Sequence, residues 1–199
     1  MIIWINGAFG AGKTTAAFEL HRRLADSFVY DPENIGYFIR RNAPKIFSMV
    51  DFQDLPLWRE FNYKMLKMIS EQYSGAIIVP MTLVDAGYFA EIIGCLREHG
   101  VEVRHFILWA SRKTILKRLR LRLSRRLGED TFAINSIDRC LYSFDNYITE
   151  GKIDTENMIS EAVVEEIAKR CELSLSTMRR PRFFRAIQRY LTLIKHIRL

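Results

Sequence analysis

One segment near the start of the chain, GAFGAGKT at residues 7–14, constrains the fold more than any other. It fits the pattern Gly-x-x-x-x-Gly-Lys-Ser/Thr, and the apolar run Ile2–Asn6 precedes it. Apolar residues then recur at helical spacing from Lys13 to about Ala25, which predicts a helix directly after the loop. In such a strand–loop–helix unit the glycines let successive backbone N–H groups point at phosphate oxygens, beside the positive end of the helix. The segment therefore predicts a phosphate-binding loop.

The residue types in this loop indicate a nucleoside triphosphate as ligand. Lys13 is expected to reach the β- and γ-phosphates of ATP, and the Thr14 hydroxyl is expected to hold Mg²⁺. A glycine-rich turn without a ligand is the alternative, which four fixed positions and the correct flanks disfavour. A dinucleotide-binding loop has a different glycine spacing. The predicted nucleotide-binding residues are Gly7, Ala8, Phe9, Gly10, Ala11, Gly12, Lys13, Thr14 and Thr15.

Strand-like and helix-like segments alternate along the rest of the chain. Further strands are predicted at Ser27–Tyr30, Ala76–Thr82, Val101–Trp109 and a short stretch near Ile153, with helical segments between them. This order predicts an α/β fold of the P-loop NTPase class, similar to nucleoside and nucleotide kinases. The expected architecture is a three-layer sandwich around a parallel five-stranded sheet.

The composition is that of a globular protein, with 49% hydrophobic and 27% charged residues among 199. Three cysteines without regular spacing, Cys95, Cys140 and Cys171, predict neither a zinc site nor a disulfide framework. The first residues carry no basic stretch before their apolar run, and no apolar run reaches the roughly 20 residues of a membrane span. We therefore expect a cytoplasmic protein.

Asp31 follows the second predicted strand, so it is expected to lie in the same crevice as the phosphate loop. There it could accept a proton from a substrate hydroxyl or help to hold the metal. The alternative is a helix start, since Asp31-Pro32-Glu33 combines a cap, a first-turn proline and an acid.

The strand over 76–82 ends without an acid, and Asp85 is expected to be a helix cap. This absence favours a small-molecule kinase over a motor ATPase.

Eight Lys and Arg residues and no acid lie between residues 112 and 126. We expect residues 112–130 to form a basic lid that closes over the nucleotide, with Arg118 and Arg122 as its phosphate contacts. The alternative is a solvated helix. Lys13, Asp31, Arg118 and Arg122 are thus the predicted catalytic residues.

The net charge of +7 resides entirely in the last 27 residues. Residues 173–199 carry seven Lys or Arg and no acid, whereas residues 1–172 carry 23 of each sign. From Arg182 onward the apolar residues fall on one side of a predicted amphipathic helix. Such a helix suits the surface of an anionic membrane, and packing on the body is the alternative. A broad apolar stripe disfavours nucleic acid. We expect a kinase-like domain at 1–172 and a basic tail helix at 173–199.

Several segments together resemble the bacterial tunicamycin-resistance family over nearly the whole chain. They are IIWINGAFGAGKT, VYDPE, DFQ, PLWR, IVPMT, EIIG, KRLRLR, IDRC and KHIRL. The resemblance implies an ATP-binding protein of nucleoside-kinase-like fold that confers resistance to tunicamycin, a lipid-tailed uridine nucleoside antibiotic. It also implies membrane association through a C-terminal amphipathic helix. By matching motif, residues 7–14 would bind ATP and Mg²⁺, Asp31 would lie in the acceptor cleft and residues 112–126 would form the lid.

Two mechanisms fit these residues, and they differ in whether the drug is changed. The first is transfer of a phosphoryl group from ATP–Mg to a hydroxyl of tunicamycin or a related nucleoside. The second is ATP-dependent sequestration of the drug at the inner face of the membrane without chemistry. A kinase of a normal metabolite that acts on the drug incidentally is a third possibility. The oligomeric state is left open.

Overall fold

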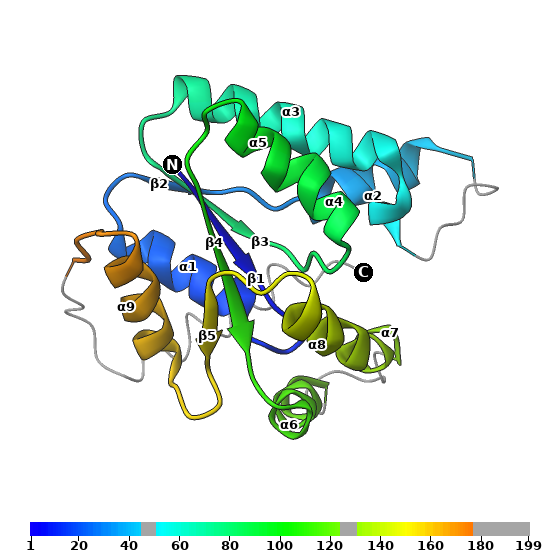
Figure 1. The fold of residues 1–199 in the computed structure, drawn as a ribbon, viewed down its shortest axis with the longest axis vertical. Coiled ribbons are helices and arrows are strands. Elements are labelled where there is room, and N and C mark those ends of the chain that lie inside the picture. The colour runs from blue at the N-terminus through cyan, green and yellow to red at the C-terminus, as the bar shows by residue number, and fades with distance from the viewer. Residues whose placement is uncertain (45–50, 124–130, 177–199) are drawn as a thin grey trace.

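The computed structural model describes residues 1–44, 51–123 and 131–176, without the side chains of residues 122 and 123. Five strands form one sheet in the order β2-β3-β1-β4-β5, and every neighbouring pair is parallel (Figure 1). The strand bounds are β1 Ile2–Asn6, β2 Ser27–Val29, β3 Ala76–Pro80, β4 Val103–Trp109 and β5 Lys152–Asp154. The prediction of a parallel five-stranded sheet is confirmed.

Helices connect the strands, and most fall where hydrophobic periodicity predicts them. Their bounds are α1 Lys13–Arg23, α2 Glu33–Asn42, α3 Pro56–Gln72, α4 Ala86–Phe89, α5 Cys95–Glu98, α6 Arg112–Leu123, α7 Thr131–Asn135, α8 Ile137–Asn146 and α9 Ser160–Arg170. A 3₁₀ turn, η2 (Phe52–Asp54), precedes α3, and a π-helical turn, η3 (Ala90–Gly94), joins α4 to α5.

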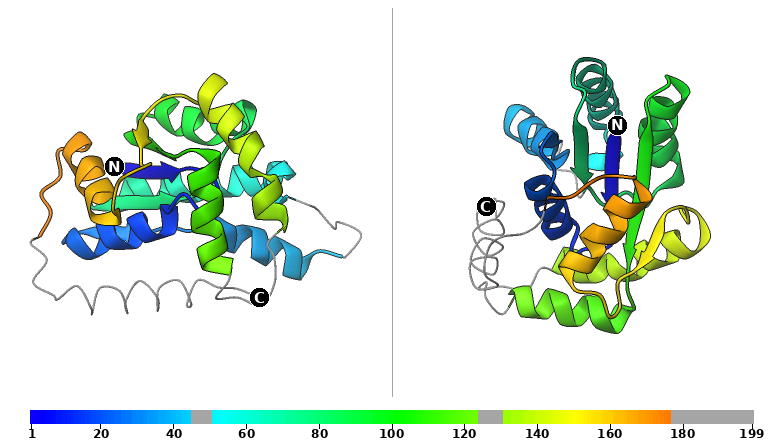
Figure 2. Two further views of the ribbon diagram at one scale, coloured as in Figure 1. Left: turned by 90° about the horizontal axis from the view of Figure 1, so that it is seen from below. Right: turned by 90° about the vertical axis from the view of Figure 1, so that its left-hand side faces the viewer.

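Helices cover both faces of the sheet, which completes the three layers (Figure 2). Ile3 and Ile5 of β1 pack with α1 and α9 on one face, while Ile2 and Trp4 pack with α3 and α5 on the other. All four side chains are fully buried. A central parallel strand must bury both faces, so its sequence is a continuous apolar run instead of an alternating one.

A third cluster of buried side chains lies where the carboxyl ends of β1 and β4 meet α6, α7 and α8. Ala8 of the phosphate loop packs there with Ile107 of β4, Ile115 and Leu119 of α6, and Phe144 of α8. The phosphate loop therefore packs against buried apolar side chains of α6, α7 and α8.

Side chains of acidic residues cap two short elements. Asp51 Oδ1 accepts the Gln53 N–H at 3.0 Å at the start of η2. Proline at the first position then starts α3, where no N–H is needed. Residues 131–146 form two helices, α7 and α8, that meet at Ser136. Asp85 does cap α4, because its Oδ1 accepts the Tyr88 N–H at 3.0 Å.

The described chain ends beside α1. Leu173 and Leu175 pack against the core of the sheet, and the Ser176 N–H donates to the Arg23 carbonyl oxygen at 2.9 Å. The predicted tail helix and the lid beyond residue 123 lie outside the described residues. Within the described segments, no helix combines the length and the apolarity that a membrane span requires.

Candidate nucleotide site

The phosphate loop has the backbone geometry that its glycines predict. Gly7 has φ +144°, and a Cβ at this position would stand 2.9 Å from the carbonyl oxygen of Leu108. Gly12, with φ +102°, has no heavy atom within 4 Å of the place a Cβ would occupy. The loop is thus tight where it leaves β1 and open where it enters α1. The free space beside Gly12 at the N-terminus of α1 fits a phosphate.

Lys13 lies over this loop. Its Nζ donates to the carbonyl oxygens of Gly7 at 2.8 Å and Ala8 at 3.1 Å, and it stands 5.3 Å from the ring centre of Phe9. Phe9 in turn meets the edge of Phe132 in α7. These contacts keep the ammonium charge at the loop. Thr14 and Thr15 lie half-buried in the first turn of α1.

Asn6 connects the phosphate loop to the segment that follows β3. Its Oδ1 accepts the backbone N–H groups of Gly7 at 2.8 Å and Leu83 at 2.9 Å, and its Nδ2 donates to the Leu83 carbonyl oxygen at 2.7 Å. The side chain is fully buried. Asn6 is not among the residues predicted for this site. Its signal was a lone polar side chain at the end of an otherwise apolar strand.

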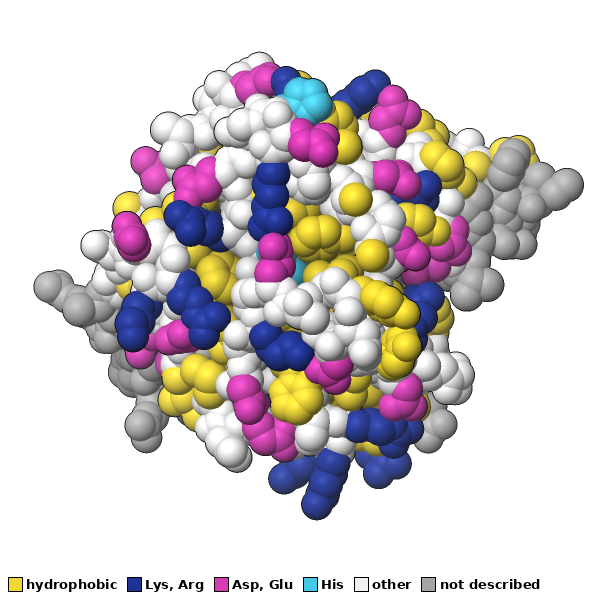
Figure 3. All heavy atoms as spheres, viewed as in Figure 1, with side chains coloured by type: hydrophobic (Ala, Val, Ile, Leu, Met, Phe, Trp, Pro, Cys, Tyr) yellow, Lys and Arg dark blue, Asp and Glu magenta, His cyan; other side chains and the backbone are white. Residues whose placement is uncertain are grey.

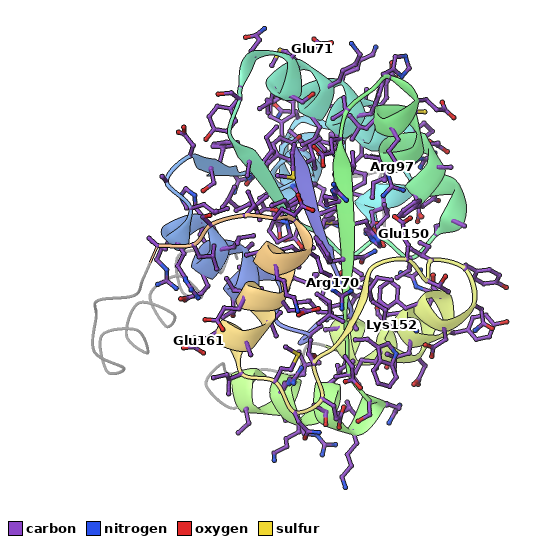
Figure 4. The ribbon with its side chains drawn as sticks, turned by 60° about the vertical axis from the view of Figure 1, so that its left-hand side comes forward. Glu71, Arg97, Glu150, Lys152, Glu161 and Arg170 are labelled. Atoms are coloured by element: carbon purple, nitrogen blue, oxygen red, sulfur yellow. The ribbon has the colours of Figure 1, made fainter. Side chains whose placement is uncertain are left out.

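His105 of β4 completes this buried polar group. Its Nε2 lies 3.1 Å from Asn6 Nδ2, and its Nδ1 lies 3.5 Å from Glu150 Oε1. Burial lowers the pKa of His105 to about 4, which the neighbouring Glu150 carboxylate only partly opposes and Arg97 assists. Figure 4 shows Arg97 and Glu150 close together beside β4, where two hydrogen bonds join them. His105 is therefore neutral at neutral pH.

Thr82 stands near the end of β3, the region where many P-loop proteins carry an acid. Its Oγ1 donates to the Gly7 carbonyl oxygen at 2.9 Å. Residues 81–84, Met-Thr-Leu-Val, contain no carboxylate. This segment therefore braces the phosphate loop and supplies no acidic ligand.

Asp31 lies at the same edge of the sheet, just past β2. Its Oδ1 accepts the Glu33 N–H at 3.1 Å, so it forms the predicted cap at the start of α2. Its neighbours are held by α3: Trp58 Nε1 donates to the Pro32 carbonyl oxygen at 3.1 Å, and the Tyr30 hydroxyl donates to Asn62 Oδ1 at 2.8 Å. A half-buried carboxylate thus lies on a braced segment at the carboxyl edge of the sheet. Its place in an acceptor cleft and proton transfer by Asp31 stay predictions.

Arg118 of the predicted lid points to the loop after β5. Its guanidinium donates to the Thr155 carbonyl oxygen at 2.6 Å and to Thr155 Oγ1 at 3.1 Å. Thr155 N–H donates to the Trp109 carbonyl oxygen at 2.7 Å, which extends the β4–β5 pairing. Arg122 belongs to α6, but its side chain lies outside the described residues. A phosphate contact by either arginine stays a prediction.

Glu156, in the same loop, caps the N-terminus of α6, although it lies 45 residues after Ser111 in the sequence. Its carboxylate accepts the Ser111 N–H at 2.7 Å, the Ser111 hydroxyl at 2.9 Å and the Thr114 hydroxyl at 2.5 Å. These bonds, led by that from Thr114, lower the pKa of Glu156. Glu156 therefore joins the loop after β5 to the start of α6.

Helix α8 packs beside the phosphate loop, because Cys140 lies in the same buried cluster as Ala8. Burial raises the pKa of Cys140, and the charge of Lys13 partly opposes this rise. The neighbouring Arg139 is mostly exposed and lies 3.6 Å from Asp51 Oδ2.

Residues that could hold Mg²⁺ are few. Within residues 1–44, 51–123 and 131–176, no three His, Cys, Asp or Glu side chains gather as a metal site. Mg²⁺ commonly takes few protein ligands and binds through the phosphates of a substrate. The Thr14 hydroxyl at the start of α1 fits that kind of site, and the described structure offers no cage of its own.

A protein-family profile described as an AAA domain matches residues 2–145. Among curated protein sequences, none matches the chain. The structure of the tunicamycin resistance protein of Deinococcus radiodurans is similar, with a TM-score of 0.73 and 30% identity over 89% of this chain and 99% of that one.

Two kinases share the fold at lower identity. Shikimate kinase from Bacteroides thetaiotaomicron matches with a TM-score of 0.58 and 18% identity, over 87% of this chain and 99% of that one. Deoxyadenosine kinase from M. mycoides matches with a TM-score of 0.52 and 18% identity, over 86% and 99%. Both likenesses concern the fold alone, a P-loop kinase-like α/β fold.

Proposed function

Because the chain belongs to the family of the Deinococcus tunicamycin resistance protein, within the AAA-type P-loop proteins, we propose that it transfers a phosphoryl group from ATP to a hydroxyl of tunicamycin or a related nucleoside. The observation that carries this proposal is the phosphate loop. There is free space beside Gly12, and the Lys13 ammonium lies against the loop backbone. The loop stands at the edge of a parallel sheet whose fold is kinase-like.

The binding residues follow from that geometry. The backbone of residues 7–15 would hold the phosphates of ATP, with the ammonium of Lys13 against the β- and γ-phosphates. The Thr14 hydroxyl would hold Mg²⁺, which neutralises part of the phosphate charge when bound. Since phosphoryl transfer depends mainly on positioning and charge stabilisation, the firm seating of this loop by Asn6 and Thr82 is part of the proposed catalysis.

Asp31 is the proposed proton acceptor for the attacking hydroxyl. It lies at the carboxyl edge of the sheet after β2, as the loop does after β1, and only β3 separates the two strands. Its bond from the Glu33 N–H fixes one oxygen, Oδ1. A carboxylate fixed in this way could take a proton without first being ordered. Arg118 and Arg122 are the proposed lid contacts to phosphate.

Drug-dependent ADP formation tests this function. The purified chain is incubated with ATP, Mg²⁺ and tunicamycin, and ADP is measured against the same mixture without drug. We expect the drug to raise ADP production, and Lys13→Ala to abolish the increase. ADP production that the drug leaves unchanged would contradict phosphoryl transfer.

A second candidate is ATP-dependent sequestration of the drug without chemistry. It is favoured by the absence of a carboxylate from residues 81–84 after β3, because the usual acid that positions Mg²⁺ is missing there. In that case ATP tightens drug binding and both ligands leave unchanged.

Association with an anionic membrane belongs to the same proposal. The support is the sequence of residues 182–198, whose basic residues oppose an apolar stripe. The tail at 173–199 would then hold the kinase-like domain at the inner face of the membrane, where a lipid-tailed drug partitions. Flotation of the chain with vesicles, with and without anionic lipid, tests this: binding without dependence on anionic lipid would contradict it.

A further inference from the structure

The cations of α6 whose side chains the structure describes divide into three groups by their contacts. Arg112 donates to Asp138 at 2.8 Å, and Arg118 is bonded to Thr155. The third group is Lys113, Lys117 and Arg120, which are exposed. None of these three makes a hydrogen bond or an ion pair with any residue in the described part of the chain. We call these three residues the α6 basic row.

The basic row faces away from the phosphate loop. At about 100° per residue, Lys113, Lys117 and Arg120 fall within roughly 60° of one another on the helix. Ile115 and Leu119 lie on the opposite side, buried against the loop. A Cβ at Gly10 would stand 3.3 Å from the Ile115 carbonyl oxygen and 3.4 Å from Leu119 Cβ. The phosphates of a nucleotide bound in the loop are therefore not the partner of the row.

The spacing of the row calls for an extended anionic partner. Lys113 and Lys117 are four residues apart and Arg120 three further, so the like charges repel one another along the helix. The row spans about 10 Å at 1.5 Å per residue. A surface that presents several negative groups over that distance relieves the repulsion, whereas a single small anion does not.

An anionic lipid surface suits this face better than a nucleic acid. Leu121, 62% exposed, adjoins Lys117 on the same side of α6. An apolar side chain among lysines and arginines is typical of elements that rest in the headgroup layer. In Figure 3, dark-blue side chains project at the bottom of the molecule, where Figure 1 places α6. That is the end of the molecule at which β4 finishes and the nucleotide loop lies.

We propose that the α6 basic row, with Leu121, is a second membrane-contact surface that binds anionic phospholipid headgroups. The inference rests on the membrane association proposed above, and it adds a contact on the folded domain to the one in the tail. Two contacts would fix the orientation of the domain, with the carboxyl edge of the sheet toward the bilayer. A lipid-tailed substrate would then enter the site from the membrane side.

Vesicle co-sedimentation of the full chain tests the row. The vesicles are phosphatidylcholine alone or phosphatidylcholine with phosphatidylglycerol. The test variant is K113Q/K117Q/R120Q. Its matched control is K64Q/K67Q/R104Q, which removes the same charge from surface residues that pair with Glu60, Glu71 and Glu102. Thermal melting by circular dichroism checks that both variants are folded.

Each cation near an anionic bilayer strengthens binding about fivefold. We therefore expect the row variant to weaken binding to the anionic vesicles on the order of 100-fold, and the control to weaken it far less. Equal losses in the two variants would overturn the proposal, as would tighter binding of the unchanged chain to duplex DNA than to vesicles at the same salt. The tail is tested separately with R182Q/R185Q/R189Q. If only that variant loses binding, the tail association stands and the row is excluded.

Discussion

Asn6 and His105, on the adjacent strands β1 and β4, face each other in the core, with Asn6 Nδ2 3.1 Å from His105 Nε2. Two backbone N–H groups bind Asn6 Oδ1, so its amide nitrogen must face the imidazole. The His105 Nε2 is therefore an acceptor, and the ring proton is on Nδ1, toward Glu150. A buried neutral histidine thus supports the residue that holds the phosphate loop.

Protonation of His105 should make the protein pH-sensitive. Its pKa is about 4 in the folded protein against about 6.5 unfolded, so the charged form favours unfolding. Above pH 6.5 His105 is neutral in both states and does not lower the free energy of unfolding. As the pH falls from 6.5 toward 4, the free energy of unfolding decreases. The loss from this group is on the order of 3 kcal/mol.

Urea unfolding at a series of pH values measures this loss. His105→Gln keeps an acceptor for Asn6 without a titrating ring, so its free energy of unfolding should fall less between pH 6.5 and 4. Glu150 and Arg97 remain in the variant, so the charged neighbours of position 105 are the same in both proteins. Identical pH dependence in the two proteins would show that His105 is not the group responsible.

Asn6→Ala should lower stability and ATP affinity together. The change leaves the Gly7 and Leu83 N–H groups and the Leu83 carbonyl without their partner in a buried site. At about 1–3 kcal/mol for each unsatisfied group, we expect a loss of roughly 3 kcal/mol or more in chemical denaturation. Thr82→Val, which removes one bond to the same loop, is the graded control and should cost about 1 kcal/mol. A larger loss of unfolding free energy in Thr82→Val than in Asn6→Ala would contradict the greater role assigned to Asn6.

Lys13→Ala should abolish tight ATP binding while the fold remains. The ammonium contacts carbonyl oxygens of its own loop and one aromatic ring, so little folding energy depends on it. We expect ATP affinity by calorimetric titration to fall at least 100-fold, on the order of 3 kcal/mol, with little change in melting temperature. An unchanged ATP affinity would exclude this loop as the nucleotide site.

Arg118 and Glu156 should act on nucleotide binding through one shared loop. Arg118 holds Thr155, and Glu156 holds the start of α6, so each fixes the loop at 154–157 against the helix. Arg118→Lys and Glu156→Gln should each weaken ATP binding, because each loosens α6, whose Ile115 and Leu119 pack against Ala8 of the phosphate loop. The ATP affinity of the double variant should fall by less than the product of the two single fold-losses, because either change alone already releases the loop. Independent effects in this double-mutant cycle would show two separate roles.

Asp31→Asn should separate catalysis from capping. The asparagine oxygen can still accept the Glu33 N–H, so stability should change little. Drug-dependent ADP formation should fall by about 10²–10⁴-fold if the carboxylate takes the proton. Asp31→Ala, which also removes the cap, should lose about 1 kcal/mol of stability in addition. Undiminished turnover in Asp31→Asn would leave Asp31 with capping alone.

Much of the fold follows from local pattern, and much of the site does not. Residues 7–14 and the apolar runs predict β1, the loop, α1 and the parallel sheet, because backbone geometry and burial act over a few residues. Asn6 and Leu83 are 77 residues apart, and Ser111 and Glu156 are 45 apart. Such pairs arise only when distant strands meet, so a single sequence marks Asn6 as unusual without naming its partner.

The cations of α6 illustrate the same limit. In the sequence they form one basic run, from which helical spacing selects Arg118 and Arg122 as the expected phosphate contacts of a lid. The structure turns Arg118 to Thr155, pairs Arg112 with Asp138 and leaves Lys113, Lys117 and Arg120 on the outer face. The orientation of α6 is set by the burial of Ile115 and Leu119 and by the cap from Glu156. Both depend on tertiary packing.

Mass spectrometry of the drug tests phosphoryl transfer most directly. Tunicamycin is incubated with the purified chain, ATP and Mg²⁺, with Lys13→Ala as the control, and its mass is measured afterwards. The account predicts a gain of one phosphoryl group that requires Lys13. A drug that binds the chain, more tightly with ATP present, yet keeps its mass would contradict phosphoryl transfer and establish sequestration.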